Sequence, residues 1–339
     1  MSYRYCAMEN WLNYKQRFQF LLLISFLFLS FRNDSKVQWG FFAHKKINRL
    51  ATFTLPPPMF GFYKEHIEYL TEHAVDPDKR RYAVKGEAPR HYIDIDHYGF
   101  SIDERFKNVP KRWTDAVEKF TEDTLNEYGI VPWHIVNMKY RLQKAFEEKD
   151  VDKILKYSAD IGHYIGDAHV PLHTTENYNG QLTNQKGIHG LWETRLVEIN
   201  DVNYDYFVGK SMYINDLTNF VWDIVKESHL AVDSVLRFER ELSDRFDKKL
   251  KYSYVKRGNS TQKNYSETFS QAYHDTLDNM VERRLRSSIL SIGSVWYTAW
   301  VDAGQPNLHK MKYKKSSDSY LEELKAIKEE QETKGRGCH

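Results

Sequence analysis

The sequence predicts an all-α protein: a single multi-helix domain over residues 39–309 with a metal cluster between its helices. Apolar residues recur at helical spacing through most of this range, and few stretches show the alternation of a strand. Prolines and glycines separate the segments without forming a long linker. Histidines and acidic residues lie four positions apart, so that each such pair projects from one face of a helix.

Residues 1–38 have the pattern of a secretory signal peptide. Lys15 and Arg17 precede an apolar run over 18–31, and a polar stretch follows it. The run is shorter than the roughly 20 apolar residues of a transmembrane helix, although a membrane anchor is the alternative. We therefore expect an exported protein, periplasmic or extracellular.

The predicted helices follow one another from the end of the signal to about residue 308. The last has the clearest core-facing stripe, with Ile289, Ile292 and Trp296 among its apolar positions. Residues 310–339 are highly charged without a useful apolar face, which predicts a solvated, disordered tail or a frayed helix. Helices are expected to begin near His44, near Pro58, after Pro110, after Trp133, at Val151, near Ile188, near Asp216 and around Ser266.

The overall charge and the cysteine content exclude some classes of protein. A formal net charge of +2 argues against nucleic-acid binding through bulk electrostatics, so any such contact should be local and centred on metal. Cys6 and Cys338 lie near the two ends of the chain and predict no disulfide framework. No stable protein partner is evident from the sequence.

The central cluster of potential ligands carries the strongest functional signal. His163 with Asp167, and His189 with Glu193, are pairs four residues apart, and His173 lies between them. One such pair alone is more often a surface pair or a satisfied core histidine. Five of these residues within 31 positions favour a divalent-metal site, because imidazole and carboxylate are the ligands zinc accepts at hydrolytic sites.

Further ligand candidates precede this cluster. Trp39 stands five residues before His44, and Asp76 stands fifteen residues before His91. Taken alone, His44 and Asp76 are typical of cap and turn residues. With the central cluster, however, the order of these residues resembles the superfamily that unites zinc-dependent phospholipase C with the single-strand-specific S1/P1 nucleases.

The resemblance implies three zinc ions held by nine residues. It assigns Asp76, His91, His163 and Asp167 to one ion, and His173, His189 and Glu193 to a second. Trp39, through its terminal amine and carbonyl oxygen, would join His44 and the bridging Asp167 at the third. This last role requires cleavage after Gln38, which a signal peptidase would not favour at this sequence.

The resemblance also implies a zinc-dependent phosphoric-ester hydrolase that attacks the phosphodiester with metal-activated water. Asp76, as a ligand beside that water, is the expected catalytic residue that orients or deprotonates it. The leading prediction is an exported endonuclease acting on single-stranded nucleic acid, with 3′-nucleotidase activity in addition. A phospholipase C acting on glycerophospholipids is the alternative, and a non-catalytic zinc-binding protein is the second alternative.

Four residues are candidates for substrate contact. Tyr92 occupies the position at which the family tends to have an aromatic pocket residue, where it would stack a base or meet a lipid headgroup, unless it is core. Lys79 or Arg80 would meet the phosphate, although solvated positive charge is the default interpretation. Asn179 lies in the interval between His173 and His189, which is closer to the phospholipases, as is Glu193 in place of aspartate.

Overall fold

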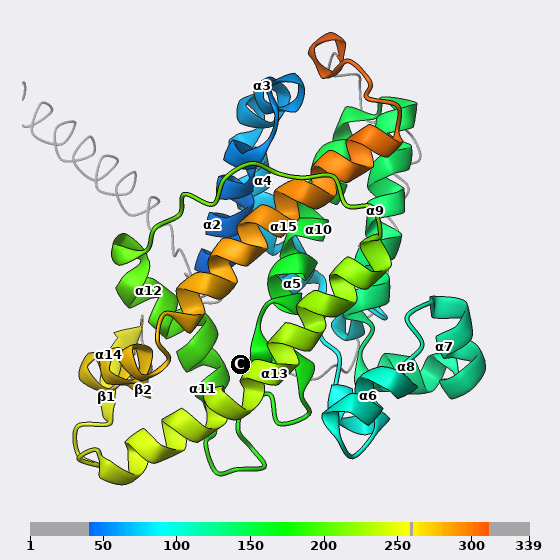
Figure 1. Cartoon of the computed structure of the whole chain (residues 1–339). Coiled ribbons are helices and arrows are strands. Elements are labelled where there is room, and N and C mark those ends of the chain that lie inside the picture. Colours follow the sequence, from blue (N-terminus) through cyan, green and yellow to red (C-terminus); the bar gives the residue numbers. More distant parts are fainter. Residues whose placement is uncertain (1–40, 258–259, 312–339) are drawn as a thin grey trace, which may run out of the picture. The chain divides into compact units, whose positions relative to one another are not determined.

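The computed structural model describes residues 41–257 and 260–311, and they form an all-helical protein with a single two-stranded sheet (Figure 1). The all-α prediction is confirmed. The predicted signal peptide, Trp39 and nearly all of the predicted tail lie outside the described residues. None of the described helices has the length and apolar character needed to cross a bilayer.

The core is built around α10 (Val151–Ala168), in which 17 of 18 residues are buried. Asp150 caps this helix, because its side chain accepts a hydrogen bond from the backbone N–H of Lys153. The long helices α9 (Val131–Glu148), α13 (Leu217–Arg245) and α15 (Met280–Asp302) pack around it, with α15 and α13 in front in Figure 1. Because the helix is covered on all sides, its polar side chains must find partners, and Asp160 accepts from Nζ of Lys156 at 2.7 Å.

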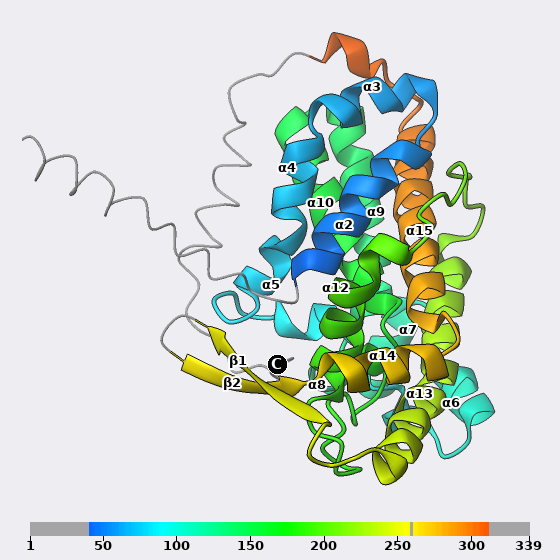
Figure 2. The same cartoon turned by 90° about the vertical axis from the view of Figure 1, so that its left-hand side faces the viewer.

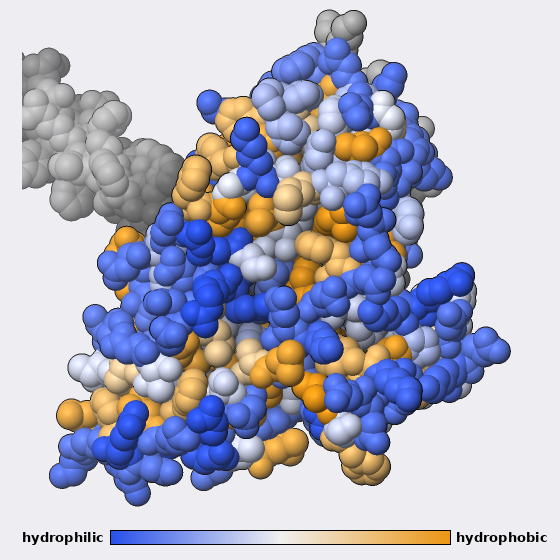
Figure 3. Space-filling view, in the orientation of Figure 1, coloured by the Kyte–Doolittle hydropathy of each residue, from blue (hydrophilic) through white to orange (hydrophobic). Residues whose placement is uncertain are grey.

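The predicted stripe of the last helix is confirmed, since Ile289, Ile292 and Trp296 of α15 are fully buried. Hydrophilic residues cover most of the face shown in Figure 3, and apolar residues form scattered patches between them.

The shorter elements are η1 (Thr52–Thr54), α3 (Pro57–Glu65), α4 (Ile67–Glu72), η2 (His73–Val75), α5 (Asp76–Arg80), η3 (Ala88–His91), η4 (Ile95–Tyr98), α6 (Ile102–Asn108), α7 (Trp113–Phe120), α8 (Glu122–Tyr128), η5 (Pro171–Thr174), α11 (Ile188–Gly190), the π-helical turn η6 (Leu191–Arg195), α12 (Leu196–Asn200), η7 (Asp201–Asn203), α14 (Glu267–Thr276) and η8 (Leu308–Lys310).

One hairpin interrupts the helical order. Strands β1 (Tyr252–Arg257) and β2 (Ser260–Tyr265) pair antiparallel, with Tyr252 opposite Tyr265 (Figure 2). The sequence analysis did not predict this hairpin.

Two glycines of α10 allow the first described helix, α2 (Phe41–Ala51), to approach it closely. A Cβ atom at Gly162 would lie 1.9 Å from Oδ1 of Asn48 on α2, and a Cβ at Gly166 would lie 2.7 Å from Cδ1 of Ile47. Asn48 is completely buried, and its Nδ2 donates to the carbonyl of Ala159, 3.0 Å away. The same contact surface brings His44 of α2 against α10.

We expect Gly162→Ala to lower the free energy of unfolding by about 1–3 kcal/mol, because the added methyl group displaces the Asn48 amide from its backbone partner. Urea denaturation followed by circular dichroism measures this change. Gly190→Ala is the matched control: it lies in a helix, no heavy atom lies within 4 Å of its added Cβ, and it should change stability by less than about 1 kcal/mol. Equal stability of the two variants would contradict the close packing of α2 on α10.

Candidate metal centre

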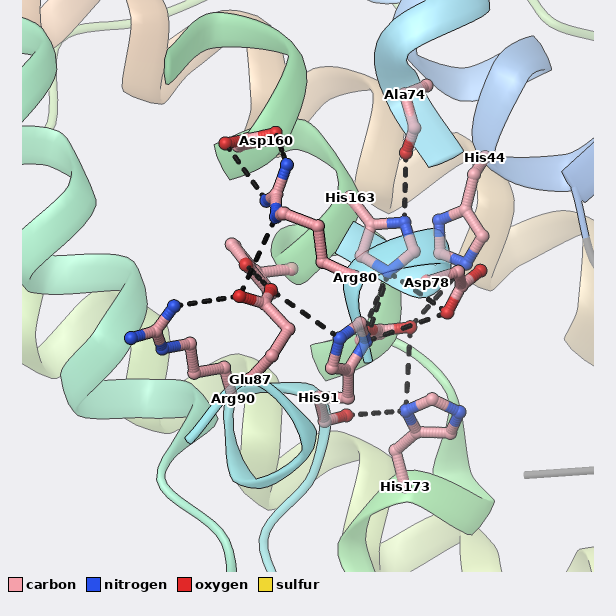
Figure 4. Close-up of polar contacts among 12 residues, drawn as sticks. His44, Ala74, Asp78, Arg80, Glu87, Arg90, His91, Asp160, His163 and His173 are labelled. Carbon is pink, nitrogen blue, oxygen red and sulfur yellow. Dashed lines mark hydrogen bonds and ion pairs between the residues drawn. The ribbon is translucent and has the colours of Figure 1, made fainter. Parts of the chain in front are cut away.

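The two histidines nearest the centre of the site are fixed by backbone carbonyls. Nδ1 of His163 lies 2.9 Å from the carbonyl oxygen of Ala74, and Nδ1 of His173 lies 2.6 Å from that of His91. A carbonyl oxygen only accepts, so Nδ1 must donate in both rings, which leaves a lone pair on each Nε2. In Figure 4, Nε2 of His163 points toward His91 and Asp78. This tautomer is the one needed for metal binding through Nε2.

The first ligand group joins α5, η3 and α10. Nε2 of His163 lies 3.1 Å from Nδ1 of His91, and these two nitrogens lie 3.2 and 2.9 Å from Oδ2 of Asp167. Oδ1 of Asp78 completes the group, 3.5 Å from His163 Nε2 and 3.7 Å from His91 Nδ1. Both histidines are fully buried, whereas the Asp78 side chain is 22% exposed.

The predicted ligand Asp76 does not join this group. Its carboxylate accepts a hydrogen bond from Nζ of Lys79 at 2.8 Å and lies 2.5 Å from Nδ1 of His73. Residues two apart on an α-helix project about 200° from each other, so only one of Asp76 and Asp78 can face the histidines. The structure turns Asp78 inward, and we replace Asp76 by Asp78 in the proposed ligand set.

The second group comprises His173, His189 and Glu193. Nε2 of His173 lies 3.3 Å from Nε2 of His189 and 3.5 Å from Oε2 of Glu193, and the His189–Glu193 distance is 2.6 Å. His189 comes from α11 and Glu193 from the following π-helical turn, so the four-residue spacing brings both side chains to one side as predicted.

The third group contains His44, His163 and Asp167, and it connects the other two. Nε2 of His44 lies 3.5 Å from Oδ1 of Asp167 and 3.4 Å from Oε1 of Glu193. Its ring stacks on His163 with the centroids 4.0 Å apart. Trp39, predicted to complete this group, lies outside the described residues.

These distances fit zinc. Four ligand atoms at bonds of about 2.0–2.1 Å in a tetrahedron stand about 3.3 Å apart, and most separations in the first two groups lie close to that value. Two imidazole nitrogens that face each other can share only one proton in a hydrogen bond, whereas both can give their lone pairs to one metal cation. The donor set is therefore better explained by metal than by hydrogen bonding.

The electrostatics of the centre keep Asp167 and Glu193 ionised. Burial would raise the pKa of Asp167, but His163 and His173 outweigh it and hold the pKa well below the ordinary value. Burial likewise opposes the ionisation of Glu193, but hydrogen bonds from His173 and His189 hold its pKa well below normal. Both carboxylates are thus available as anionic ligands at neutral pH.

The four predicted substrate residues have partners within the protein. Lys79 pairs with Asp76, and Nη2 of Arg80 lies 3.1 Å from Oδ2 of the buried Asp160. The buried Tyr92 donates its hydroxyl to the carbonyl of Glu127 at 3.1 Å, and Oδ1 of Asn179 accepts from the N–H of Gly187 at 2.9 Å. Their contact with substrate stays a prediction, and these partners give each of them a structural role.

Sequence reasoning missed one further acid beside the centre. Glu87 is 1% exposed and its Oε1 lies 3.8 Å from Nε2 of His91, while Oε2 accepts from Nη1 of Arg90 at 2.8 Å. Glu87 lies four residues before His91, and the same four-residue spacing of a histidine and an acid marks the pairs of the central cluster, so the sequence did contain a signal for it.

Three groups of buried histidines and acids, drawn from neighbouring helices, could each hold a metal ion, as in a metal-dependent enzyme. The family model described as S1/P1 Nuclease matches residues 39–290, and the chain belongs to that family. It is accordingly a metal-binding hydrolase that acts on phosphodiester bonds, in a family that is zinc-dependent and whose substrate is nucleic acid. Comparison with curated proteins gives no match.

Two matched variants test which aspartate binds metal. Asp78→Asn should reduce zinc affinity by more than the roughly 10–100-fold typical of losing an outer hydrogen bond to a ligand, because it removes an anionic donor. Asp76→Asn should leave zinc affinity within about twofold of the wild type. Equilibrium dialysis with competing chelator measures both, and the reverse order would restore Asp76 as the ligand.

A second prediction concerns the ion pairs that anchor α5. Burial would raise the pKa of Asp160, but Arg80 and Lys156 outweigh it and lower the pKa to about 2. A depressed folded-state pKa gives stability that is present above the unfolded value near 3.8 and is lost as the pH falls toward 2. Asp160→Asn should therefore lower the free energy of unfolding by about 3–5 kcal/mol at pH 7.

Urea denaturation between pH 7 and pH 3 checks this prediction. The difference between the wild type and Asp160→Asn should be constant above about pH 5 and should narrow below about pH 4. Asp233→Asn on α13 is the control, because its side chain is 81% exposed. If the difference in the free energy of unfolding between the wild type and Asp160→Asn does not change with pH, ionised Asp160 is not the source of this stability.

Proposed function

We propose that this protein is an exported, single-strand-specific endonuclease with 3′-nucleotidase activity, and that it holds three zinc ions. The observation that supports this most is the sharing of ligands. His163 belongs to two ligand groups, and Asp167 lies near the histidines of both. His44 contacts acids of both main groups. Shared ligands would hold the cations beside one another, as two-metal phosphodiester hydrolysis requires.

When bound, zinc would supply charge neutralisation at the phosphoryl oxygens and a lowered pKa for the attacking water. The side chains of the protein position these events. Asp167 faces His91 and His163 with one oxygen and His44 with the other, so it can bridge two ions. Because Asp78 is the most exposed acid of the proposed ligand set, we transfer to it the role of orienting or deprotonating water that we had expected of Asp76.

The proposal also includes the untested parts of the sequence analysis. We propose that residues 1–38 direct export to the periplasm or beyond, and that cleavage exposes Trp39 as the last ligand of the third ion. A phospholipase C is the enzymatic alternative, which Glu193 in place of aspartate favours. Both activities require the same centre, so the substrate must be decided by assay.

His163→Ala should lower hydrolysis at least about 100-fold and reduce thermal stability, since it removes a donor from two ligand groups and leaves its neighbours unpaired. The assays are release of acid-soluble nucleotides from single-stranded DNA and of diacylglycerol from phosphatidylcholine, each with and without chelator. His309→Ala, at an exposed histidine of η8, is the control.

Chelator-sensitive nucleotide release alone would support the nuclease. Diacylglycerol release alone would favour the phospholipase, and the absence of both activities would favour a non-catalytic zinc protein. Wild-type activity in His163→Ala would contradict the assignment of the centre.

A further inference from the structure

Positive charge is concentrated in the hairpin β1–β2 and in the residues just before it. Between Asp247 and Tyr265 there are six lysines and arginines and a single acidic residue, in a chain whose net charge is only +2. Lys251 is engaged in the fold, because its Nζ lies 2.9 Å from Oε1 of the buried Glu239. Lys248, Lys249 and Lys263 are exposed.

One face of the hairpin changes from buried to exposed along its length. Alternate residues of a strand share a face, and so do directly paired residues, so Tyr252, Tyr254, Lys263 and Tyr265 lie on the same face. Tyr265 is 5% exposed and stacks on Phe269 of α14, with ring centroids 5.4 Å apart. Two residues further out, Tyr254 is 74% exposed opposite Lys263.

The buried end of this face abuts the metal centre's own segment. The Tyr265 ring lies against Gly187, with 3.6 Å between its Cε2 and the position of a Cβ on that glycine. Gly187 has φ +103° and immediately precedes α11, which carries His189. The exposed tyrosine and lysine therefore continue a surface that begins two residues from a proposed zinc ligand.

The chemistry of this face matches one kind of partner. An exposed aromatic ring offers stacking to a base of any sequence, and neighbouring ammonium groups offer contacts to phosphates. Lys263 is held beside this position, since its Nζ lies 3.7 Å from the ring centroid of Tyr252. A lipid surface would also use the positive charge and can accommodate a tyrosine at the headgroup level, but it presents no flat ring on which Tyr254 could stack.

We propose that the β1–β2 hairpin is an accessory binding surface for single-stranded nucleic acid, in which Tyr254 stacks a base and Lys263 contacts a phosphate of the strand that enters the metal centre. This inference rests on the proposed nuclease function and adds to it a contact outside the centre.

The experiment uses the zinc-loaded protein and separates binding from turnover. Binding of a fluorescent phosphorothioate oligothymidylate, which resists cleavage, is measured by anisotropy. KM and kcat are measured on an oligothymidylate and on the dinucleotide thymidylyl-thymidine, which is too short to reach both sites. Binding to anionic phosphatidylglycerol vesicles is measured in parallel.

We expect Tyr254→Ala to weaken oligothymidylate binding and raise KM by about tenfold. Lys263→Ala should reduce the slope of log affinity against log salt by about 0.7, the value for one phosphate contact to a single strand. Neither variant should alter turnover of the dinucleotide. The matched controls on α9 are Tyr140→Ala, whose side chain is 60% exposed, and Lys144→Ala, 74% exposed, and both should behave as the wild type.

The outcomes distinguish the two proposals. If the wild type cleaves DNA but both hairpin variants bind as it does, the hairpin inference is overturned and the nuclease stands. If the wild type cleaves no nucleic acid yet its binding depends on Tyr254, the binding surface stands and the nuclease proposal fails. If the hairpin variants lose binding to vesicles but bind the oligonucleotide as the wild type does, the hairpin is a membrane contact and the inference is overturned.

Discussion

The carboxylate of Asp167, buried at the end of α10, is the constraint on which the rest of the centre depends. Its two oxygens lie within 3.5 Å of ring nitrogens of His44, His91, His163 and His173, which come from four different elements. A buried carboxylate is stable only when it is paired and hydrogen-bonded. Two of the surrounding histidines hold protons more strongly than usual. Burial lowers the pKa of His44, yet Glu193 and Asp167 outweigh it and raise that pKa to about 9. Burial likewise lowers the pKa of His173, but Asp167 and Glu193 outweigh it and raise that pKa. Metal replaces those protons, so metal binding and folding are linked.

The position of Asp167 in turn depends on small residues of α10. Gly162 and Gly166 stand one turn apart on the face that meets α2, and a side chain at either would strike Asn48, Ile47 or His44. Such close approach of two helices is what brings His44 to within stacking distance of His163. The glycines therefore help to position His44 in the centre, through the close approach of α2 to α10.

The helical class and the grouping of the central ligands could be predicted from the sequence, because both depend on local spacing. His163 with Asp167 and His189 with Glu193 are brought together by a single turn of helix. The choice between Asp76 and Asp78 could not be made locally, because the two acids flank one proline and only the packing of α5 decides which faces inward. The hairpin was missed because residues 252–265 are polar and aromatic without clear alternation of apolar residues. The helical stretch expected from about Ser266 onward is likewise divided in the structure, where Asp278 and Asn279 adopt positive φ between α14 and α15.

The same distinction between local and global properties applies to charge. A net charge of +2 correctly argues against a protein coated in positive potential, but it does not describe where the charges lie. A zinc centre recognises one phosphodiester, and nucleic acids and phospholipids both present that group. Discrimination between them must therefore come from surfaces beside the centre, where a strand continues for several nucleotides and a lipid headgroup ends. The proposed hairpin surface begins where Tyr265 meets Gly187, two residues before His189. Its exposed tyrosine and lysine would suit the repeating base and phosphate of a strand better than the single phosphate of a lipid.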